Sequence, residues 1–301
     1  MAGSSLPRRA LGRTLRRLRE RAQKSQLAAG IKAEISPQSI SRLEEGHKVR
    51  LATSQLKDLL DLYEVDDPGT ERDEILSLWQ EVREQDQAAK IAGATKGWWR
   101  AYSDQYFAHF DHYLSLESAA NHLTTHQLAL IPGLFQTPDY RRAIVRTAYP
   151  DLSPVDVERR IELTVRRQER VQDSSFRIDA FLSEAIVRSK PTGPDVMAQQ
   201  LMHLAELSER PNISIRMIPL DAESPLWLMV QAFALLEFPP LSNRVVEPPI
   251  VYAEGYEGAL FLEQEAVIDR YRRAINDIQR LALSEDETST LMRKYAKEHT
   301  S

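Results

Sequence analysis

Histidine and carboxylate residues gather in two short stretches of the sequence, where they could bind a metal ion. His109, Asp111 and His112 lie in the first stretch, and His122 and His126 lie in the second. Structural zinc sites use fixed ligand sets in a closed shell, and these residues do not have the spacing of such a set. We therefore expect surface or partly buried histidines, with no metal and no cofactor.

A second group of charged residues has the chemistry of an acid and base pair. Asp173, Asp179 and Glu184 lie close in sequence to Arg177. Carboxylates are common on a strand and its following loop, and nothing in the sequence fixes their separation. The chain also lacks the glycine-rich phosphate loops, the serine nucleophile motif and the paired-histidine zinc motif. The sequence therefore predicts no catalytic site.

A third group could hydrogen-bond to DNA bases. Gln38, Ser41 and Arg42 share the solvent-facing side of a helix that Ser36 caps and Pro37 opens. Arginine can bridge guanine O6 and N7, glutamine can bridge adenine N6 and N7, and serine is less selective. Gly46 is the expected end of this helix.

The charge of the chain is unevenly distributed. Residues 1–50 contain 12 Lys and Arg against 4 Asp and Glu, whereas the remainder contains 27 against 40. A basic head on an acidic body would suit binding of a phosphate backbone by one end of the chain. A solvated basic arm is the alternative that composition leaves open.

Several short helices are predicted to position Gln38, Ser41 and Arg42. Leu11, Leu15, Leu18 and Ala22 form one apolar stripe, and the leucines between 51 and 62 mark a later helix. The head is thus predicted as a small helical domain over residues 1–66.

The segment SQLAAGIKAEISPQSISRLEEG, residues 25–46, resembles the helix-turn-helix of phage-repressor-like (Xre-type) regulators. The resemblance implies that the helix over 37–45 enters the major groove of DNA and reads bases through Gln38, Ser41 and Arg42. It also implies an ion pair between Arg19 and Glu44. Four residues are the expected phosphate contacts: Gln26, His47, Lys48 and Arg50.

Two features depart from that family. The second helix contains Ala29 and Gly30, and its turn contains Glu34 where relatives usually have glycine. We expect this helix to be weakly packed. Pro37 has no side-chain donor, and Glu45 would repel phosphate unless it accepts a hydrogen bond from cytosine N4.

The rest of the chain is predicted as a linker helix over 67–96 and an α+β domain over 97–301. Apolar stripe residues of the linker could pack on the head or on a second subunit. Five strands are predicted over 176–182, 213–220, 233–238, 249–255 and 259–264, and helices over 154–172, 194–209, 265–283 and 285–297. The basic helix in this set carries Arg159, Arg160, Arg166, Arg167 and Arg170, as a solvated face or a second nucleic-acid patch.

The order GWWRAY, LALIPGLFQTPDYRRAIV, VERRIELTVRRQER and VYAEG resembles the domain that follows an Xre-type head in many actinomycete regulators. The resemblance implies an antitoxin-like transcription regulator whose gene commonly neighbours that of a small partner protein. We expect a homodimer that binds double-stranded operator DNA and is controlled by that partner. A small-molecule sensor is the alternative, and an enzyme fused to a DNA-binding head is a third.

Four apolar residues are candidates for a partner or ligand surface: Trp98, Trp99, Leu134 and Phe135. Core packing is the competing interpretation of these side chains. The chain has no cysteine, no apolar run long enough to span a bilayer and no apolar segment behind its basic start. A cytoplasmic protein without membrane spans is the expectation.

Overall fold

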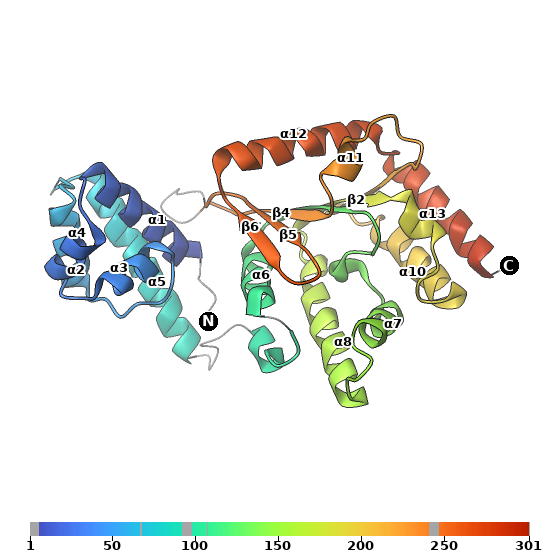
Figure 1. The fold of residues 1–301 in the computed structure, drawn as a ribbon, viewed down its shortest axis with the longest axis horizontal. Helices are drawn as coiled ribbons and strands as arrows, with labels where there is room; N and C mark the ends of the chain where they lie inside the picture. Colours follow the sequence, from blue (N-terminus) through green and yellow to red (C-terminus); the bar gives the residue numbers. More distant parts are fainter. Residues whose placement is uncertain (1–5, 67, 92–97, 107, 241–246, 301) are drawn as a thin grey trace. The chain divides into compact units, whose positions relative to one another are not determined.

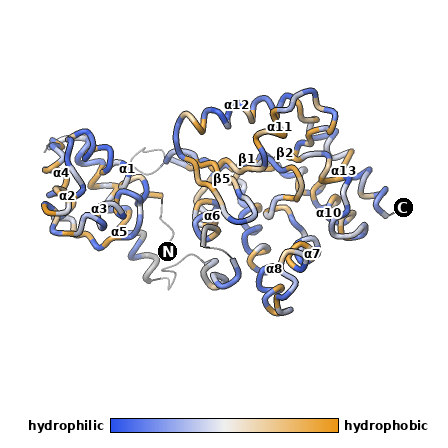
Figure 2. The backbone as a smooth tube through the Cα atoms, viewed as in Figure 1, coloured by the Kyte–Doolittle hydropathy of each residue, from blue (hydrophilic) through white to orange (hydrophobic). Residues whose placement is uncertain are grey.

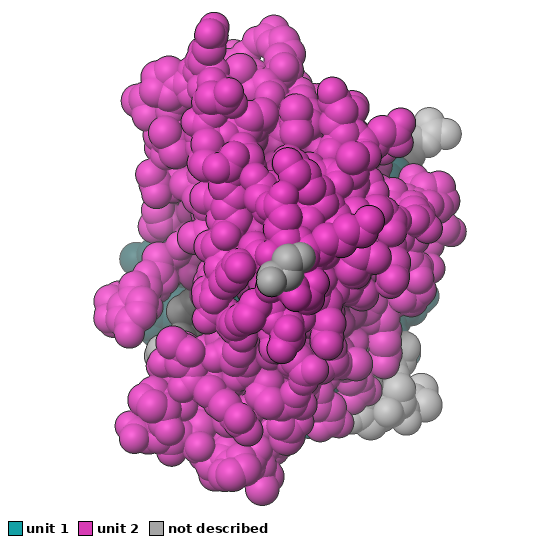
Figure 3. Space-filling view, turned by 90° about the vertical axis from the view of Figure 1, so that its right-hand side faces the viewer, with its two compact units in different colours: residues 1–101, 110–119, 238–247 teal, residues 102–109, 120–237, 248–301 magenta. Residues whose placement is uncertain are grey.

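The computed structural model describes residues 6–66, 68–91, 98–106, 108–240 and 247–300. The chain has a helical head followed by a larger domain that combines helices with a six-stranded mixed sheet, so the predicted fold class is confirmed. The chain divides into two compact units (Figure 3). The first comprises residues 1–101, 110–119 and 238–247, and the second comprises residues 102–109, 120–237 and 248–301.

The head contains five helices whose apolar faces form one core (Figure 1). Leu11, Leu15 and Leu18, the stripe of the first helix, are almost completely buried in it. The helices are α1 (Leu6–Arg21), α2 (Gln26–Lys32), α3 (Pro37–Glu44), α4 (Thr53–Leu62) and α5 (Thr70–Ile91).

The segment predicted as a linker contains α5, and α5 packs on the head. Its stripe residues Ile75, Leu78, Trp79 and Val82 belong to the same core as α1. Trp79 Nε1 also donates a hydrogen bond to Thr53 Oγ1 at 3.1 Å. The apolar stripe of α5 is therefore used within this chain, which removes it as the contact with a second subunit.

The ends of α3 are defined by the residues that the sequence indicates. Ser36 Oγ accepts a hydrogen bond from the Ser39 backbone N–H at 3.1 Å, and Pro37 occupies the first turn. At the other end Gly46 has φ +74°, and a Cβ there would lie 2.8 Å from Arg9 Cα. Gly46 is thus required by its backbone conformation and by its closeness to α1.

Helix α2 is weakly packed, as its sequence predicts. It buries only the small residues Ala29 and Gly30, while Leu27 and Ile31 are 59% and 72% exposed. The turn that follows has Glu34 at φ +53°, in the left-handed region that side chains with a Cβ rarely adopt.

We expect Glu34→Gly to stabilise the head by about 1 kcal/mol, because glycine adopts the left-handed conformation without the steric cost of a Cβ. Urea unfolding of the full chain, with exchange of head amides as the local readout, measures this change. The control Glu34→Ala keeps the Cβ and should give no such gain. Equal stability of the glycine and alanine variants would contradict the argument.

The larger domain is built on the sheet order β3-β2-β1-β4-β5-β6. The β1–β2 and β2–β3 pairs are parallel, and the remaining neighbours are antiparallel. All five predicted strands are present. The strands are β1 (His122–Gln127), β2 (Arg177–Ser183), β3 (Ile213–Ile218), β4 (Phe233–Glu237), β5 (Ile250–Glu254) and β6 (Ala259–Leu262).

Helices cover both faces of this sheet, with α11 and α12 on one face and α7 and α8 on the other (Figure 1). Hydrophobic residues are frequent along β2, which lies between these layers (Figure 2). No described helix is long and apolar enough to cross a membrane. The elements are η1 (Trp98–Tyr102), α6 (Ala108–Ala119), η2 (Gly133–Phe135), α7 (Pro138–Ala148), α8 (Pro154–Gln168), η3 (Glu169–Gln172), α9 (Glu184–Arg188), α10 (Pro194–Leu207), α11 (Leu226–Met229), α12 (Glu265–Leu281) and α13 (Glu285–Thr300).

Candidate nucleic-acid interface and other sites

The outer face of α3 presents hydrogen-bonding side chains to solvent. Gln38 and Arg42 are exposed, and neither side chain forms a hydrogen bond or ion pair with any residue that the structure describes. Ser41 is half-buried, and its Oγ donates to Glu45 Oε1 at 2.9 Å. Two of the three predicted base-reading residues are thus available without breaking an internal contact.

A buried ion pair holds α3 against α1. Arg19 Nε and Nη2 donate to the two carboxylate oxygens of Glu44 at 2.6 and 2.9 Å, in the pairing that the sequence resemblance implies. The Glu44 side chain is 3% exposed and that of Arg19 is 12% exposed. The hydrogen bond to Glu44 raises the pKa of Arg19, so the guanidinium stays charged.

Gln26 belongs to this same network. Its Nε2 donates to Glu44 Oε2 at 3.0 Å, while Arg19 Nη1 donates to the Lys24 backbone oxygen at 3.0 Å. The sequence predicts Gln26 as a phosphate contact and gives no signal for its contact with Glu44, because these residues are 18 positions apart. The network joins α1, α2 and α3, and the role of Gln26 as a phosphate contact stays a prediction.

The other expected phosphate contacts differ in their surroundings. Lys48 Nζ lies 3.2 Å from Asp86 Oδ2, and His47 Nε2 lies 3.4 Å from Glu45 Oε2. Arg50 is exposed and has no side-chain partner in the described part of the chain. Arg50 is therefore the side chain of this group that is free to meet a phosphate.

The basic charge of the head is largely neutralised once α5 is included. Arg8 Nη2 lies 2.5 Å from Asp86 Oδ1, and Arg17 and Arg21 each lie 3.0 Å from Glu71 carboxylate oxygens. Residues 1–91 contain 16 Lys and Arg against 15 Asp and Glu. With α5 included, the folded head therefore carries almost no net charge. Its attraction to DNA depends on where the unpaired cations lie.

The residues expected to form a partner or ligand surface are mostly buried. Trp99, Leu134 and Phe135 are 8%, 4% and 0% exposed, and Trp98 is half-buried. Trp99 Nε1 donates to Asp111 Oδ1, and the backbone oxygen of Phe135 accepts from Gln200 Nε2. The surface interpretation of Trp99, Leu134 and Phe135 is wrong, because packing and these hydrogen bonds hold them in the cores.

His122 lies between two carboxylates on the sheet. Its Nε2 is 2.7 Å from Asp179 Oδ2 and its Nδ1 is 2.9 Å from Glu237 Oε2. Hydrogen bonds that His122 donates to Asp179 and then to Glu237 raise the pKa of His122 to about 9, and the bond from His122 lowers the pKa of Glu237 to about 2. Arg177 and Arg272 pair with the outer sides of these carboxylates. His122 is therefore an imidazolium in a charge network across β2, β1 and β4.

The other residues that the sequence offers for metal binding or acid–base chemistry each have hydrogen-bond partners of their own. His126 Nδ1 is 2.8 Å from the Gln231 backbone oxygen, and burial lowers its pKa. Glu184 accepts from the Leu220 backbone N–H, and Asp173 accepts from Ser175. Among the described residues no group of three His, Cys, Asp or Glu is placed to hold a metal ion. The His109 side chain lies outside the described residues.

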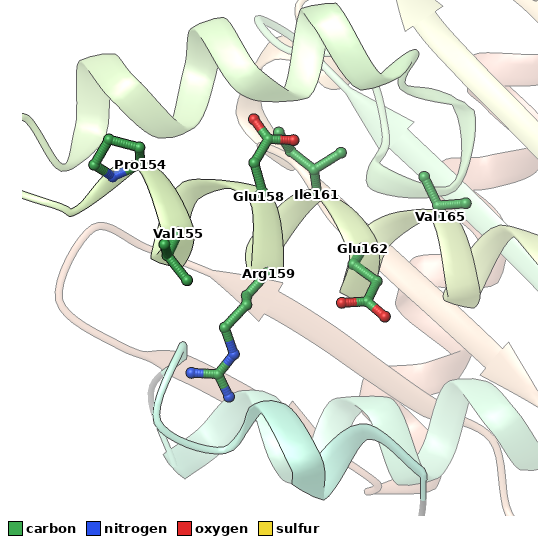
Figure 4. A pocket seen from close by; sticks show the side chains of 7 residues that line it. All are labelled: Pro154, Val155, Glu158, Arg159, Ile161, Glu162 and Val165. Carbon is green, nitrogen blue, oxygen red and sulfur yellow. The ribbon is translucent and has the colours of Figure 1, made fainter.

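An open groove of about 670 Å³ runs along one side of α8 (Figure 4). Val155 and Val165 form part of its apolar lining, and Arg159 and Glu162 point to the same side of the helix (Figure 4). Its charged lining residues are Glu158, Arg159 and Glu162.

The comparisons with known proteins match the two parts of the chain separately. Residues 10–75 match the model of a helix-turn-helix domain, which includes α1 to α4 and the start of α5. Residues 110–294 match the model described as a domain of unknown function (DUF5753). No curated protein and no solved structure matches the chain. The chain is a helix-turn-helix protein that belongs to the DUF5753 family.

Proposed function

We propose that this protein is a sequence-specific DNA-binding transcription regulator of the Xre type, with α3 as the recognition helix. The observation that carries the proposal is the outer face of α3, where Arg42 and Gln38 are exposed and have no side-chain partner among the described residues. The helix-turn-helix match supports it. Arg42 would bridge a guanine and Gln38 an adenine in the major groove.

We further propose that the protein acts in the cytoplasm as a homodimer on a two-fold symmetric operator. Helix-turn-helix dimers place two recognition helices about one DNA turn apart, so each protomer reads a half-site. Because α5 uses its apolar stripe inside the head, the contact between protomers must lie elsewhere.

Control by the larger domain is proposed to act on DNA binding by the head. Within the first compact unit, Glu247 is buried and forms ion pairs with Arg9 and Arg13 of α1. The resemblance favours a small partner protein in an antitoxin-like or developmental switch, without enzymatic activity.

Small-molecule sensing is the second candidate. It is favoured by a specific observation: Arg141 of α7 and Arg160 of α8 each have a buried Nε without a hydrogen-bond acceptor among the described residues. In either form the coupling is reciprocal, because a molecule that changes operator affinity must have its own affinity changed by operator to the same extent.

The DNA-reading role is tested first by selecting operator sites from random DNA with the full-length protein. The Arg42→Ala variant is then measured on the selected site. We expect this variant to lose about 1–3 kcal/mol on the selected site and to relax the preference at one base position. The loss arises because alanine cannot make the two hydrogen bonds to guanine. Fluorescence anisotropy on operator and random duplexes measures both effects.

Arg50→Ala is the matched control, since Arg50 is the exposed cation expected on a phosphate. It should weaken operator and random DNA alike and lower the magnitude of the log–log salt slope by about 1. If Arg42→Ala weakened both duplexes equally as well, base reading by α3 would be refuted.

A further inference from the structure

The two edges of the six-stranded sheet differ in how they are covered. At the β3 edge, the Met217 backbone N–H donates to Thr288 Oγ1 at 3.0 Å, and the Leu283 backbone N–H donates to the Met217 oxygen at 2.8 Å. The connection from α12 to α13 and the start of α13 therefore occupy this edge. Such a cover prevents an edge strand from pairing with another chain.

Strand β6 forms the other edge, and among the described strands it pairs with β5 alone (Figure 1). The Gly255 backbone N–H donates to the Gly258 oxygen at 2.7 Å and closes the hairpin between β5 and β6. Hydrogen-bonded pairs alternate along an antiparallel ladder, so the next such pair includes Leu260 and skips Ala259. The N–H and C=O of Ala259 therefore point away from β5, and they meet no hydrogen-bond partner in the described part of the chain.

The side chains of β6 do not protect this edge. The strand has the sequence ALFL, without the lysine or proline that blocks pairing at many natural sheet edges. Leu260 is 60% exposed, and Tyr256 in the hairpin turn is 96% exposed. Leu260 lies on the same sheet face as Leu262, which packs against the core cluster that contains Phe233 and Val251. An added strand would extend this apolar face and cover Leu260.

The charge of the chain around β6 is acidic. Residues 248–269 contain five Asp and Glu and no Lys or Arg. Glu254 and Glu257 are exposed on the hairpin, and Glu265 is exposed just after β6. A second copy of β6 at this edge would bring two acidic hairpins together, and like charges across paired strands are destabilising. A basic segment would instead be attracted to the edge.

We propose that β6 is a docking edge for an extended, basic segment of a partner protein, which adds to the sheet as a further strand. Main-chain hydrogen bonds to Ala259 would set the register of the segment, and its apolar side chains would cover Leu260. Its lysine or arginine residues would meet the acidic hairpin. This proposal deepens the partner-protein form of the proposed function and rests on it only for the regulatory consequence.

The test is the selection of binding peptides by the full-length protein from a library of random octapeptides. We expect the selected peptides to alternate apolar residues with Lys or Arg, because successive side chains of a strand point to opposite faces. Fluorescence anisotropy of a synthesised peptide from this selection then gives its Kd. A copy with N-methylated backbone nitrogens keeps every side chain but cannot donate main-chain hydrogen bonds, and it should bind about tenfold or more weakly.

Two variants place the peptide at β6. Ala259→Pro removes the outward N–H and keeps the ladder with β5, so it should weaken the peptide about tenfold or more and change the Tm by no more than about 3 °C. Leu260→Lys puts a cation where the basic peptide docks and should weaken it as well. Leu228→Lys is the matched control, because Leu228 on α11 is also exposed, at 49%, and its variant should keep the full affinity. If Ala259→Pro failed to fold, Leu260→Lys and the N-methylated peptide would still decide the question.

Three results would overturn the proposal. A selection that yields no binding peptide would show that β6 is not a docking edge. Equal affinity of the N-methylated peptide, or of Leu260→Lys, would mean that charge elsewhere holds the peptide. A dimer that Ala259→Pro converts to a monomer in sedimentation would assign the edge to a second copy of the chain. Because no DNA is present, failure of this experiment leaves DNA reading by α3 untouched, and a failed operator selection leaves the docking edge untouched.

Discussion

Glu44→Ala is expected to destabilise the head by about 3–5 kcal/mol. The substitution leaves the Arg19 guanidinium in a largely buried position without its carboxylate, and it removes the acceptor of the Gln26 amide. Breaking a buried pair on one side has a cost of this size because the remaining charge is uncompensated. For a head of about 90 residues, the melting temperature should fall by about 15 °C or more.

Calorimetry of the full chain measures the change, and hydrogen exchange of α3 assigns it to the head. Glu20→Ala is the control, since Glu20 pairs with Arg16 at 3.0 Å on the surface, with both side chains more than half exposed. Its effect should stay within about 1 kcal/mol. An unchanged melting temperature for Glu44→Ala would mean that the pair does not hold α3.

The larger domain is expected to lose about 2–3 kcal/mol of stability between pH 6.5 and pH 9. His122 has an ordinary pKa of 6.5 in the unfolded chain and about 9 in the fold, where Asp179 and Glu237 hold its charged form. A raised pKa contributes fully below pH 6.5 and is lost as the pH rises through 9. Glu237, with its pKa lowered to about 2, loses its contribution only on the acid side of pH 4.5.

Urea unfolding at a series of pH values measures this loss. His122→Gln cannot take up the proton, so its stability should be nearly flat over the same range and should meet that of the unaltered protein near pH 9. His203→Gln is the matched control, because burial lowers the pKa of His203, which is the opposite of the shift at His122. A steep decline that survives in His122→Gln would assign the effect to another group.

Local sequence signals determined the ends of α3 and the class of the fold. Ser36, Pro37 and Gly46 set the ends of α3 by hydrogen bonding and backbone conformation, which act between neighbours in sequence. The five predicted strands carry their own apolar and β-branched patterns. Arg19 with Glu44 was implied by resemblance, and the structure contains that pair.

Other features depend on residues that are far apart in sequence. The α5 stripe is compatible with either of two partners, and only its packing with α1 assigns it to the head. Residues 1–50 are basic on their own, yet Glu71 and Asp86 fold back on Arg8, Arg17 and Arg21. Charge counted along a chain carries no information on which ions become neighbours.

The sequence by itself therefore determined a helix-turn-helix head with Gln38 and Arg42 on the exposed face of α3, followed by an α+β domain. The tertiary structure alone decided which cations are neutralised and which remain. Arg159 and Arg160 are adjacent in sequence and equal in type, but one pairs with Asp104 and the other lies over the ring of Tyr149. The physical reason is that a helix turns 100° per residue, so neighbouring side chains enter different surroundings that only long-range packing supplies.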